Sequence, residues 1–114
     1  MIIDCHGHYT TAPSELEAWR KRQIATLDDP SKAPKRSELV IRDDQIRESL
    51  ENAQLKMQRE RGTDVTIFSP RASFMAHHIG DESTSREWSM LCNDLVYRVC
   101  QLYPDNFVGV CQLP

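Results

Sequence analysis

Apolar and polar positions along the chain follow two periods, which together predict strands separated by helices. The first apolar residues lead into polar residues 4–8 and predict a short strand. Residues 14–27 carry apolar side chains at helical spacing and predict an amphipathic helix whose first turn holds Pro13. Residues 29–42 are rich in proline and basic residues, so we expect a surface insertion there.

The second half of the chain repeats this alternation. Residues 44–61 predict one helix with Gly62 at its C-terminal cap. Its apolar residues recur at spacings of three and four: Ile46, Leu50, Ala53 and Met57. The β-branched run 64–69 predicts a second strand. Residues 85–103 predict the clearest helix, preceded by a capping box of Thr84 and Glu87, and residues 106–113 predict a third strand.

The order of these elements indicates the fold class. Strands separated by helices pair in parallel, and near-continuous apolar strands indicate a sheet covered on both faces. A full (β/α)₈ barrel takes about 250 residues. The 114 residues are therefore expected to form a partial α/β barrel domain, 1–114, of two and a half βα units.

Composition narrows the classes of partner. The chain has 14 basic and 17 acidic residues, a net charge of −3, which argues against nucleic-acid binding. No apolar run approaches the roughly 20 residues of a membrane span, and Asp4 interrupts any secretory signal. The four cysteines form no CxxC pair, which favours a reducing, cytoplasmic setting.

The chemistry begins at the end of the first strand, where His6 and His8 flank Gly7. Side chains two apart on a strand share a face, so the two imidazoles are expected to project together and hold a divalent metal. The alternative is a polar strand exit with an ordinary histidine pair. Alternation places Cys5 on the opposite, packed face and Asp4 on the face of the histidines. Gly7 would let a metal or substrate approach the backbone.

Strand ends also organise the rest of the site. In an α/β barrel, ligands gather at the C-terminal ends of the strands. His6 and His8 end the first strand, and residues 71–81 follow the second, so both are expected on the functional face.

Residues 1–9 and 68–81 together resemble the 4-oxalomesaconate hydratase family. This family lies in the amidohydrolase superfamily, in the branch that includes the aminocarboxymuconate semialdehyde decarboxylases. The resemblance implies a zinc-dependent lyase of bacterial protocatechuate or gallate breakdown, which adds water to an unsaturated keto-tricarboxylate. It implies that His6 and His8 are two metal ligands, with manganese or iron as the alternative metals.

The resemblance also implies that a further histidine and an acidic ligand come from later strands, outside these residues. We therefore expect the isolated chain to be inactive and to hold zinc weakly or not at all.

The implied substrate carries several carboxylates, which call for guanidinium donors. Arg71 would clamp one carboxylate, with Ser73 beside it as a second substrate-binding residue. The alternative for Arg71 is a solvent-facing side chain paired with Asp81 or Glu82. His77 and His78 are candidates for substrate binding or proton transfer; the alternative is that one packs in the loop and the other is exposed.

Two other functions remain open. One is a decarboxylase or hydrolase of the same superfamily that acts on a small carboxylic acid, because a fold does not determine a reaction. The other is a non-catalytic fragment or association module. Open sheet edges invite pairing with another chain, including a second copy in a homo-oligomer.

Overall fold

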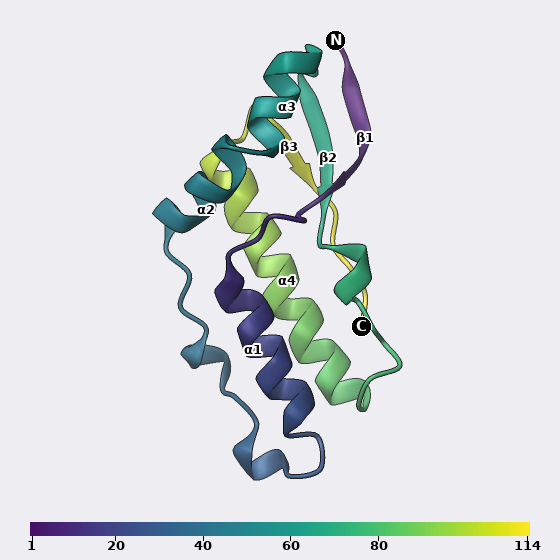
Figure 1. The fold of residues 1–114 in the computed structure, drawn as a ribbon. Coiled ribbons are helices and arrows are strands. Elements are labelled where there is room, and N and C mark those ends of the chain that lie inside the picture. Colours follow the sequence, from purple (N-terminus) through teal and green to yellow (C-terminus); the bar gives the residue numbers. More distant parts are fainter.

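A computed structural model describes all 114 residues and confirms the parallel sheet. The strands β1 (Ile3–His8), β2 (Val65–Ser69) and β3 (Phe107–Gly109) lie in the order β1-β2-β3, and both neighbouring pairs are parallel. Figure 1 shows β2 between the other two strands. The sheet corresponds to the first strands of the predicted α/β barrel.

Four helices accompany the sheet: α1 (Ser14–Ala25), α2 (Asp43–Glu51), α3 (Gln54–Arg61) and α4 (Glu82–Leu102). Three short 3₁₀ turns lie at Pro30–Lys32, Arg36–Glu38 and Ala72–Phe74. The molecule measures 49 × 26 × 18 Å, with the sheet towards one end and α1 and α4 side by side towards the other (Figure 1). None of the helices combines the length and the apolar content that a membrane crossing requires.

The predicted single helix 44–61 is wrong, because the chain breaks at Asn52 and Ala53 into α2 and α3. Leu50 and Leu55 are both buried. In one continuous helix, five residues would separate their directions by about 140°, so one of them would face solvent. The break lets both side chains reach the core and leaves Met57, expected inside, 44% exposed. Gly62 does adopt the expected left-handed cap, with φ of 67°.

Two further boundaries differ from the prediction. The last helix begins at Glu82, not at residue 85, because Asp81 is its cap: the Asp81 carboxylate accepts hydrogen bonds from the backbone N–H and the hydroxyl of Thr84. The third strand was expected to reach residue 113 but ends at Gly109. Its partner strand β2 ends at Ser69, before Pro70, and offers no further residues for pairing. Beyond it, the N–H of Gln112 donates to the side chain of Asn93 on α4.

The core lies between the helices and one face of the sheet. Its central side chains come from α2, α4, β2 and β3, and they include Leu50, Trp88, Val99, Phe68 and Phe107. Phe68 and Phe107 are in contact across the sheet, with ring centroids 4.7 Å apart. The helix predicted over residues 85–103 turns one face to this core, with the following buried side chains: Trp88, Leu91, Cys92, Leu95 and Val99.

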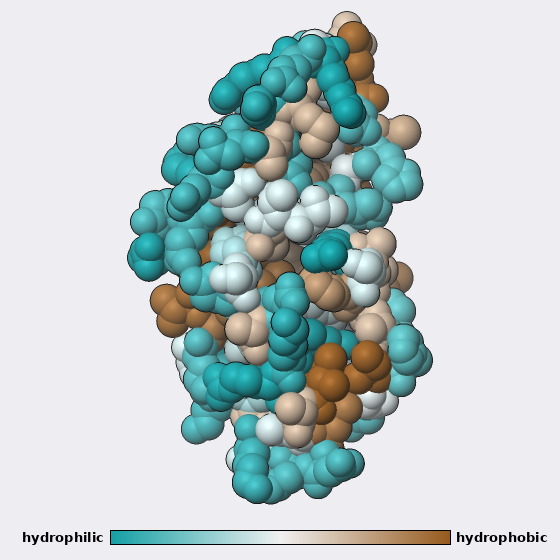
Figure 2. Space-filling model, in the orientation of Figure 1, coloured by the Kyte–Doolittle hydropathy of each residue, from teal (hydrophilic) through white to brown (hydrophobic).

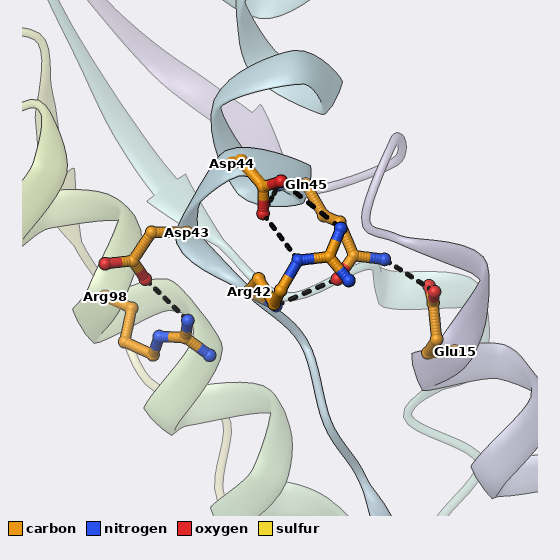
Figure 3. Close-up of polar contacts among 6 residues, drawn as sticks. All are labelled: Glu15, Arg42, Asp43, Asp44, Gln45 and Arg98. Atoms are coloured by element: carbon orange, nitrogen blue, oxygen red, sulfur yellow. Dashed lines mark hydrogen bonds and ion pairs between the residues drawn. The ribbon is translucent and has the colours of Figure 1, made fainter.

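Polar contacts join the start of α2 to α1 and α4 (Figure 3). Arg98 donates to Asp43 at 2.6 Å, and Gln45 donates to Glu15 at 2.6 Å. The Asp43 side chain is exposed and those of Arg98, Gln45 and Glu15 are half-buried, so both contacts still reach solvent and serve mainly to set the relative position of the helices.

The opposite face of the sheet is uncovered, which differs from the expected two-sided cover. Ile3 is 53% exposed and Val108 is 55% exposed. Figure 2 shows further hydrophobic atoms at the end of the molecule where Figure 1 places the N-terminus. In a closed barrel, this face is the interior wall, filled by branched side chains. The sequence pattern therefore belongs to a larger sheet than these three strands make.

Candidate functional site

The imidazoles of His6 and His8 lie together at the C-terminal end of β1, as predicted. Their ring centroids are 4.9 Å apart and the rings are nearly perpendicular, at 84°. Parallel pairing sets His8 opposite Ser69, the last residue of β2. The two strand ends thus bring together residues 61 positions apart in the sequence.

Ser69 determines which nitrogen of His8 can bind a cation. The Ser69 hydroxyl lies 2.7 Å from Nδ1 of His8 and donates its own proton to the carbonyl of Gly7. It therefore accepts from Nδ1–H, and so does the carbonyl of Pro70, 3.2 Å from the same atom. Both partners favour the tautomer whose Nε2 lone pair is available to a metal. Sequence reasoning missed Ser69, although its place at the end of the second strand pointed to it.

Gly7 is required for the contact between β1 and β2. A Cβ atom at this position would meet the Thr66 side chain, lie 2.8 Å from the carbonyl oxygen of Ile67 and lie 3.2 Å from the Phe68 ring. The close approach is thus made by the neighbouring strand, whereas the sequence suggested a metal or substrate. Only glycine lets the two strands pair at this point.

A β-bulge overturns the expected placement of Asp4 and Cys5. The pairing shifts between Asp4 and Gly7, so Asp4 lies opposite Thr66, whose side chain is buried beneath the helices. Asp4 therefore pairs with the helix side of β2, whereas His8 pairs with Ser69, although Asp4, His6 and His8 line one groove beside α3. The Asp4 carboxylate accepts from the N–H of His6 at 3.0 Å. Cys5 is exposed instead of packed. Strict alternation fails because the bulge sets two residues of β1, Cys5 and His6, against the single residue Ile67 of β2.

The donor set fits half of a metal site. Two neutral imidazoles on one side of a strand suit zinc and similar divalent metals. No group of three or more His, Cys, Asp or Glu side chains is placed to hold an ion. His6 and His8 could thus supply two ligands, whereas protein zinc sites use three or four.

A cavity of about 170 Å³ opens one residue beyond the histidines, between the ends of β1 and β2 and helices α1 and α4. Tyr9 and Pro70 line it beside Arg71, Phe74 and Trp88. Its walls are largely apolar, and Arg71 is its only cation. The cavity therefore has the character of a small-molecule site with one anion-binding group.

Arg71 has no carboxylate partner. Its Nε donates to Ser73 at 2.9 Å, and its guanidinium carbon lies 4.3 Å from the centroid of the Phe74 ring. The alternative pairing with Asp81 or Glu82 is not formed, since Asp81 caps α4 and Glu82 pairs with Arg86. The outer nitrogens of the guanidinium remain available for an anion.

His77 and His78 are not brought to this site. Both are exposed, and neither lines the cavity around Arg71. Nδ1 of His77 lies 3.3 Å from the hydroxyl of Ser85 at the start of α4. The structure therefore places both on the same loop as Arg71 but apart from His6 and His8.

Three other titratable groups line the cavity: the Glu17 carboxylate, which pairs with Lys21, and the Tyr9 and Cys92 side chains, which burial keeps protonated. Burial raises the pKa of Tyr9 to about 12, although its hydrogen bond with Ser49 acts in the opposite direction. Burial also raises the pKa of the Cys92 thiol to about 12. At neutral pH neither is a ready nucleophile or base.

Comparison with known proteins agrees with this architecture. The 2-keto-4-carboxy-3-hexenedioate hydratase of Sphingobium sp. is 52% identical over 114 residues, which are 100% of this chain and 33% of that protein. The crystal structure of 4-oxalomesaconate hydratase from Rhodopseudomonas palustris is 58% identical, with a TM-score of 0.93 over 100% of this chain and 33% of that one.

The chain thus spans about a third of the length of these relatives. Its three parallel strands and their helices match the N-terminal part of the relative's barrel, which confirms the predicted fold class. A family model described as Amidohydrolase matches residues 3–114, and by this match the chain belongs to the amidohydrolase family.

Proposed function

We propose that this chain carries the N-terminal third of a metal-dependent hydro-lyase that adds water to an unsaturated keto-tricarboxylate. The observation that supports this most strongly is the pair of imidazoles at the end of β1, with His8 held in a metal-binding tautomer by Ser69. The substrate class comes from the relatives, which are hydratases of 2-keto-4-carboxy-3-hexenedioate and of 4-oxalomesaconate.

His6 and His8 would hold zinc, with manganese or iron as alternatives. When bound, the metal polarises a keto or enol oxygen, or lowers the pKa of water to about 7. Ser69 and the Pro70 carbonyl fix the His8 ring for this role through Nδ1. Since the chain provides two ligands, the proposal includes weak metal binding and no catalysis by these 114 residues alone.

Arg71 would bind a substrate carboxylate in the cavity beside the histidines. Its Nε is occupied by Ser73, which leaves the outer nitrogens to form a two-point contact with the carboxylate. His77 and His78 enter the proposal as proton-transfer or substrate-binding groups because they lie on the loop that connects Arg71 to α4, although in the structure neither lines the cavity. The four free cysteines favour a cytoplasmic setting.

A chimeric enzyme tests the function. Residues 1–114 of this chain would replace the corresponding third of the Rhodopseudomonas palustris hydratase, which is 58% identical over this stretch. Loss of 4-oxalomesaconate absorbance would be followed for the chimera and for its His6→Ala and His8→Ala variants. We expect activity within about tenfold of the parent and a loss of at least about a hundredfold in each variant.

A folded, metal-loaded chimera that does not consume 4-oxalomesaconate would contradict the proposal. If it instead decarboxylates or hydrolyses another small carboxylic acid, the superfamily stands but the hydration assignment is wrong.

A further inference from the structure

A series of contacts connects the buried interior between α1 and α4 to the guanidinium of Arg71. Trp88, on α4, is completely buried, and its indole N–H donates to the carbonyl of Phe74 at 2.6 Å. The ring of Phe74 in turn lies against Arg71. A residue in the core thus reaches the candidate substrate-binding group through a single intervening residue.

The hydrogen bond from Trp88 determines where the 3₁₀ turn Ala72–Phe74 lies. A buried indole N–H needs a partner, and the Phe74 carbonyl is the partner it has. The backbone hydrogen bonds of this turn are local, from Phe74 to Arg71 and from Met75 to Ala72, and the Phe74 side chain packs against the edge of the core. The indole therefore anchors the turn to α4.

Arg20, on α1, fixes the indole from the other side. It is 4% exposed and forms no ion pair; its guanidinium carbon lies 5.0 Å from the centroid of the Trp88 ring. One nitrogen donates to Gln23 at 2.6 Å, and Nη2 has no partner. A buried cation without a carboxylate is costly, and the face of the indole offsets part of that cost. Rotation of the Trp88 ring would remove this contact.

Phe74 links the position of the turn to the position of the Arg71 guanidinium. Arg71 stacks on the Phe74 ring at 4.3 Å while its Nε bonds Ser73, a residue of the same turn. Both contacts of Arg71 are thus made by a segment that Trp88 anchors. A long arginine side chain otherwise samples many rotamers, and ordering it costs free energy on binding.

We propose that Trp88, held in place by Arg20, positions the Arg71 side chain, and that it acts through the carbonyl and the ring of Phe74. The proposal rests on the proposed function in one respect, namely that the positioned group receives a substrate carboxylate. Trp88 contacts no reacting atom in this scheme. It limits the orientations that the Arg71 side chain adopts before a carboxylate binds.

The two tryptophans supply a matched test on the 114-residue chain. Trp19 is also buried, stacks on Trp88 at 6.4 Å and donates its N–H to a backbone carbonyl, that of Lys35. Trp88→Phe and Trp19→Phe therefore remove the same group from neighbouring positions. The readout is the ¹⁵N–¹H signal of Arg71 Nε, whose bond to Ser73 protects it from exchange with water.

We expect Trp88→Phe to lower the exchange protection of Arg71 Nε roughly fivefold, about the net value of one hydrogen bond, and to move its signal towards that of a free arginine. Trp19→Phe should leave this signal unchanged. Phe74→Leu, at a half-buried position on the edge of the core, should reproduce the Trp88→Phe result while the buried indole stays in place. An unchanged Arg71 signal in Trp88→Phe or in Phe74→Leu would overturn the proposal, and so would an equal loss in Trp19→Phe.

A titration with tricarballylate, a simple tricarboxylate, separates this proposal from the proposed function. If the carboxylate binds, the Arg71 Nε signal of the parent chain shifts on titration, and Trp88→Phe weakens that response. If tricarballylate leaves the parent signal in place while Trp88→Phe still releases Arg71, the positioning holds and the assignment of Arg71 to substrate is wrong.

Discussion

The Nδ1 atom of His8 lies 2.7 Å from the hydroxyl oxygen of Ser69, and this contact joins the ends of two parallel strands. Because the same hydroxyl donates to the Gly7 carbonyl, it accepts from His8 and fixes the tautomer of the imidazole. The β1–β2 pairing thus does more than build the sheet, since it also prepares one candidate metal ligand.

Ser69→Ala should weaken metal binding without removing either imidazole. Loss of a partner that orients a ligand lowers metal affinity by about ten- to a hundredfold in complete sites, and we expect about tenfold for this pair. Zinc titration followed by the side-chain signals of His6 and His8 measures the effect. Ser73→Ala is the control, since that hydroxyl contacts Arg71 instead. Equal affinities for the two variants would show that Ser69 does not support the site.

Gly7→Ala should disrupt the pairing of β1 with β2. The added methyl would clash with the backbone of β2 at Ile67, where no rotamer change can relieve it. Overpacking of this kind typically costs about 1–3 kcal/mol of unfolding free energy. Urea denaturation measures the loss, and Gly62→Ala is the comparison, because that site has no neighbouring atom within 4 Å and suffers only backbone strain at its positive φ. A Gly7→Ala protein as stable as the parent would contradict the observed register.

Stability should fall as the pH rises from about 9 towards 12, since Cys92 has an ordinary pKa of 9.0 and burial raises it to about 12 in the folded state. In this window the unfolded chain releases the thiol proton and the folded chain keeps it, so alkali favours unfolding. The slope from one such group is about 1.4 kcal/mol per pH unit. Urea denaturation between pH 8 and about 11 should therefore show a shallower slope for Cys92→Ala than for the parent.

Tyr9 has a pKa raised in the same direction, so a slope should remain in Cys92→Ala. Cys111→Ala, which removes an exposed thiol, should leave the parent slope unchanged. If both cysteine variants show the same slope, the Cys92 thiol is not the group responsible.

Asp81 should stabilise α4 at neutral pH and lose that effect in acid. Hydrogen bonds from the backbone and side chain of Thr84 hold the pKa of Asp81 below its ordinary value. The carboxylate therefore contributes stability above the unfolded pKa, and the contribution disappears as the pH falls through the lowered folded value. Asp81→Ala should melt at a lower temperature than Asp81→Asn at pH 7, because an amide oxygen still caps the helix.

The same pair of Asp81 variants gives the pH test. The advantage of the parent over Asp81→Asn should disappear on acidification, because the parent then carries a neutral carboxyl group. A parent that keeps its full advantage in acid would exclude the charged cap as its source.

The sequence supported the parallel order of strands and the joint position of His6 and His8, because both follow from local periodicity. It could not anticipate the bulge that pairs Asp4 with Thr66 and His8 with Ser69, since the bulge depends on how β1 meets β2. The break at Asn52 was also invisible, because Met57 continued the helical pattern while Leu55 was the residue the core required.

The candidate site was likewise predictable only in part. Because His8 and Arg71 lie at the ends of two successive strands, the sequence predicted that they lie at the same end of the sheet. In the structure Tyr9, the residue after His8, lines the same cavity as Arg71. Ser69, Phe74 and Trp88 went unnoticed as supporting residues because their roles depend on contacts across elements. The loop holding His77 and His78 carries no periodic pattern, so sequence alone did not indicate where its side chains lie.

The most direct measurement of the central claim is a zinc titration of the 114-residue chain, followed by the imidazole signals of all four histidines. The account predicts that His6 and His8 respond together with one metal per chain, that either single alanine variant weakens the response by about tenfold, and that dialysis removes the metal. Independent responses of His6 and His8, an equal response of His77 and His78, or one zinc retained after dialysis would contradict it.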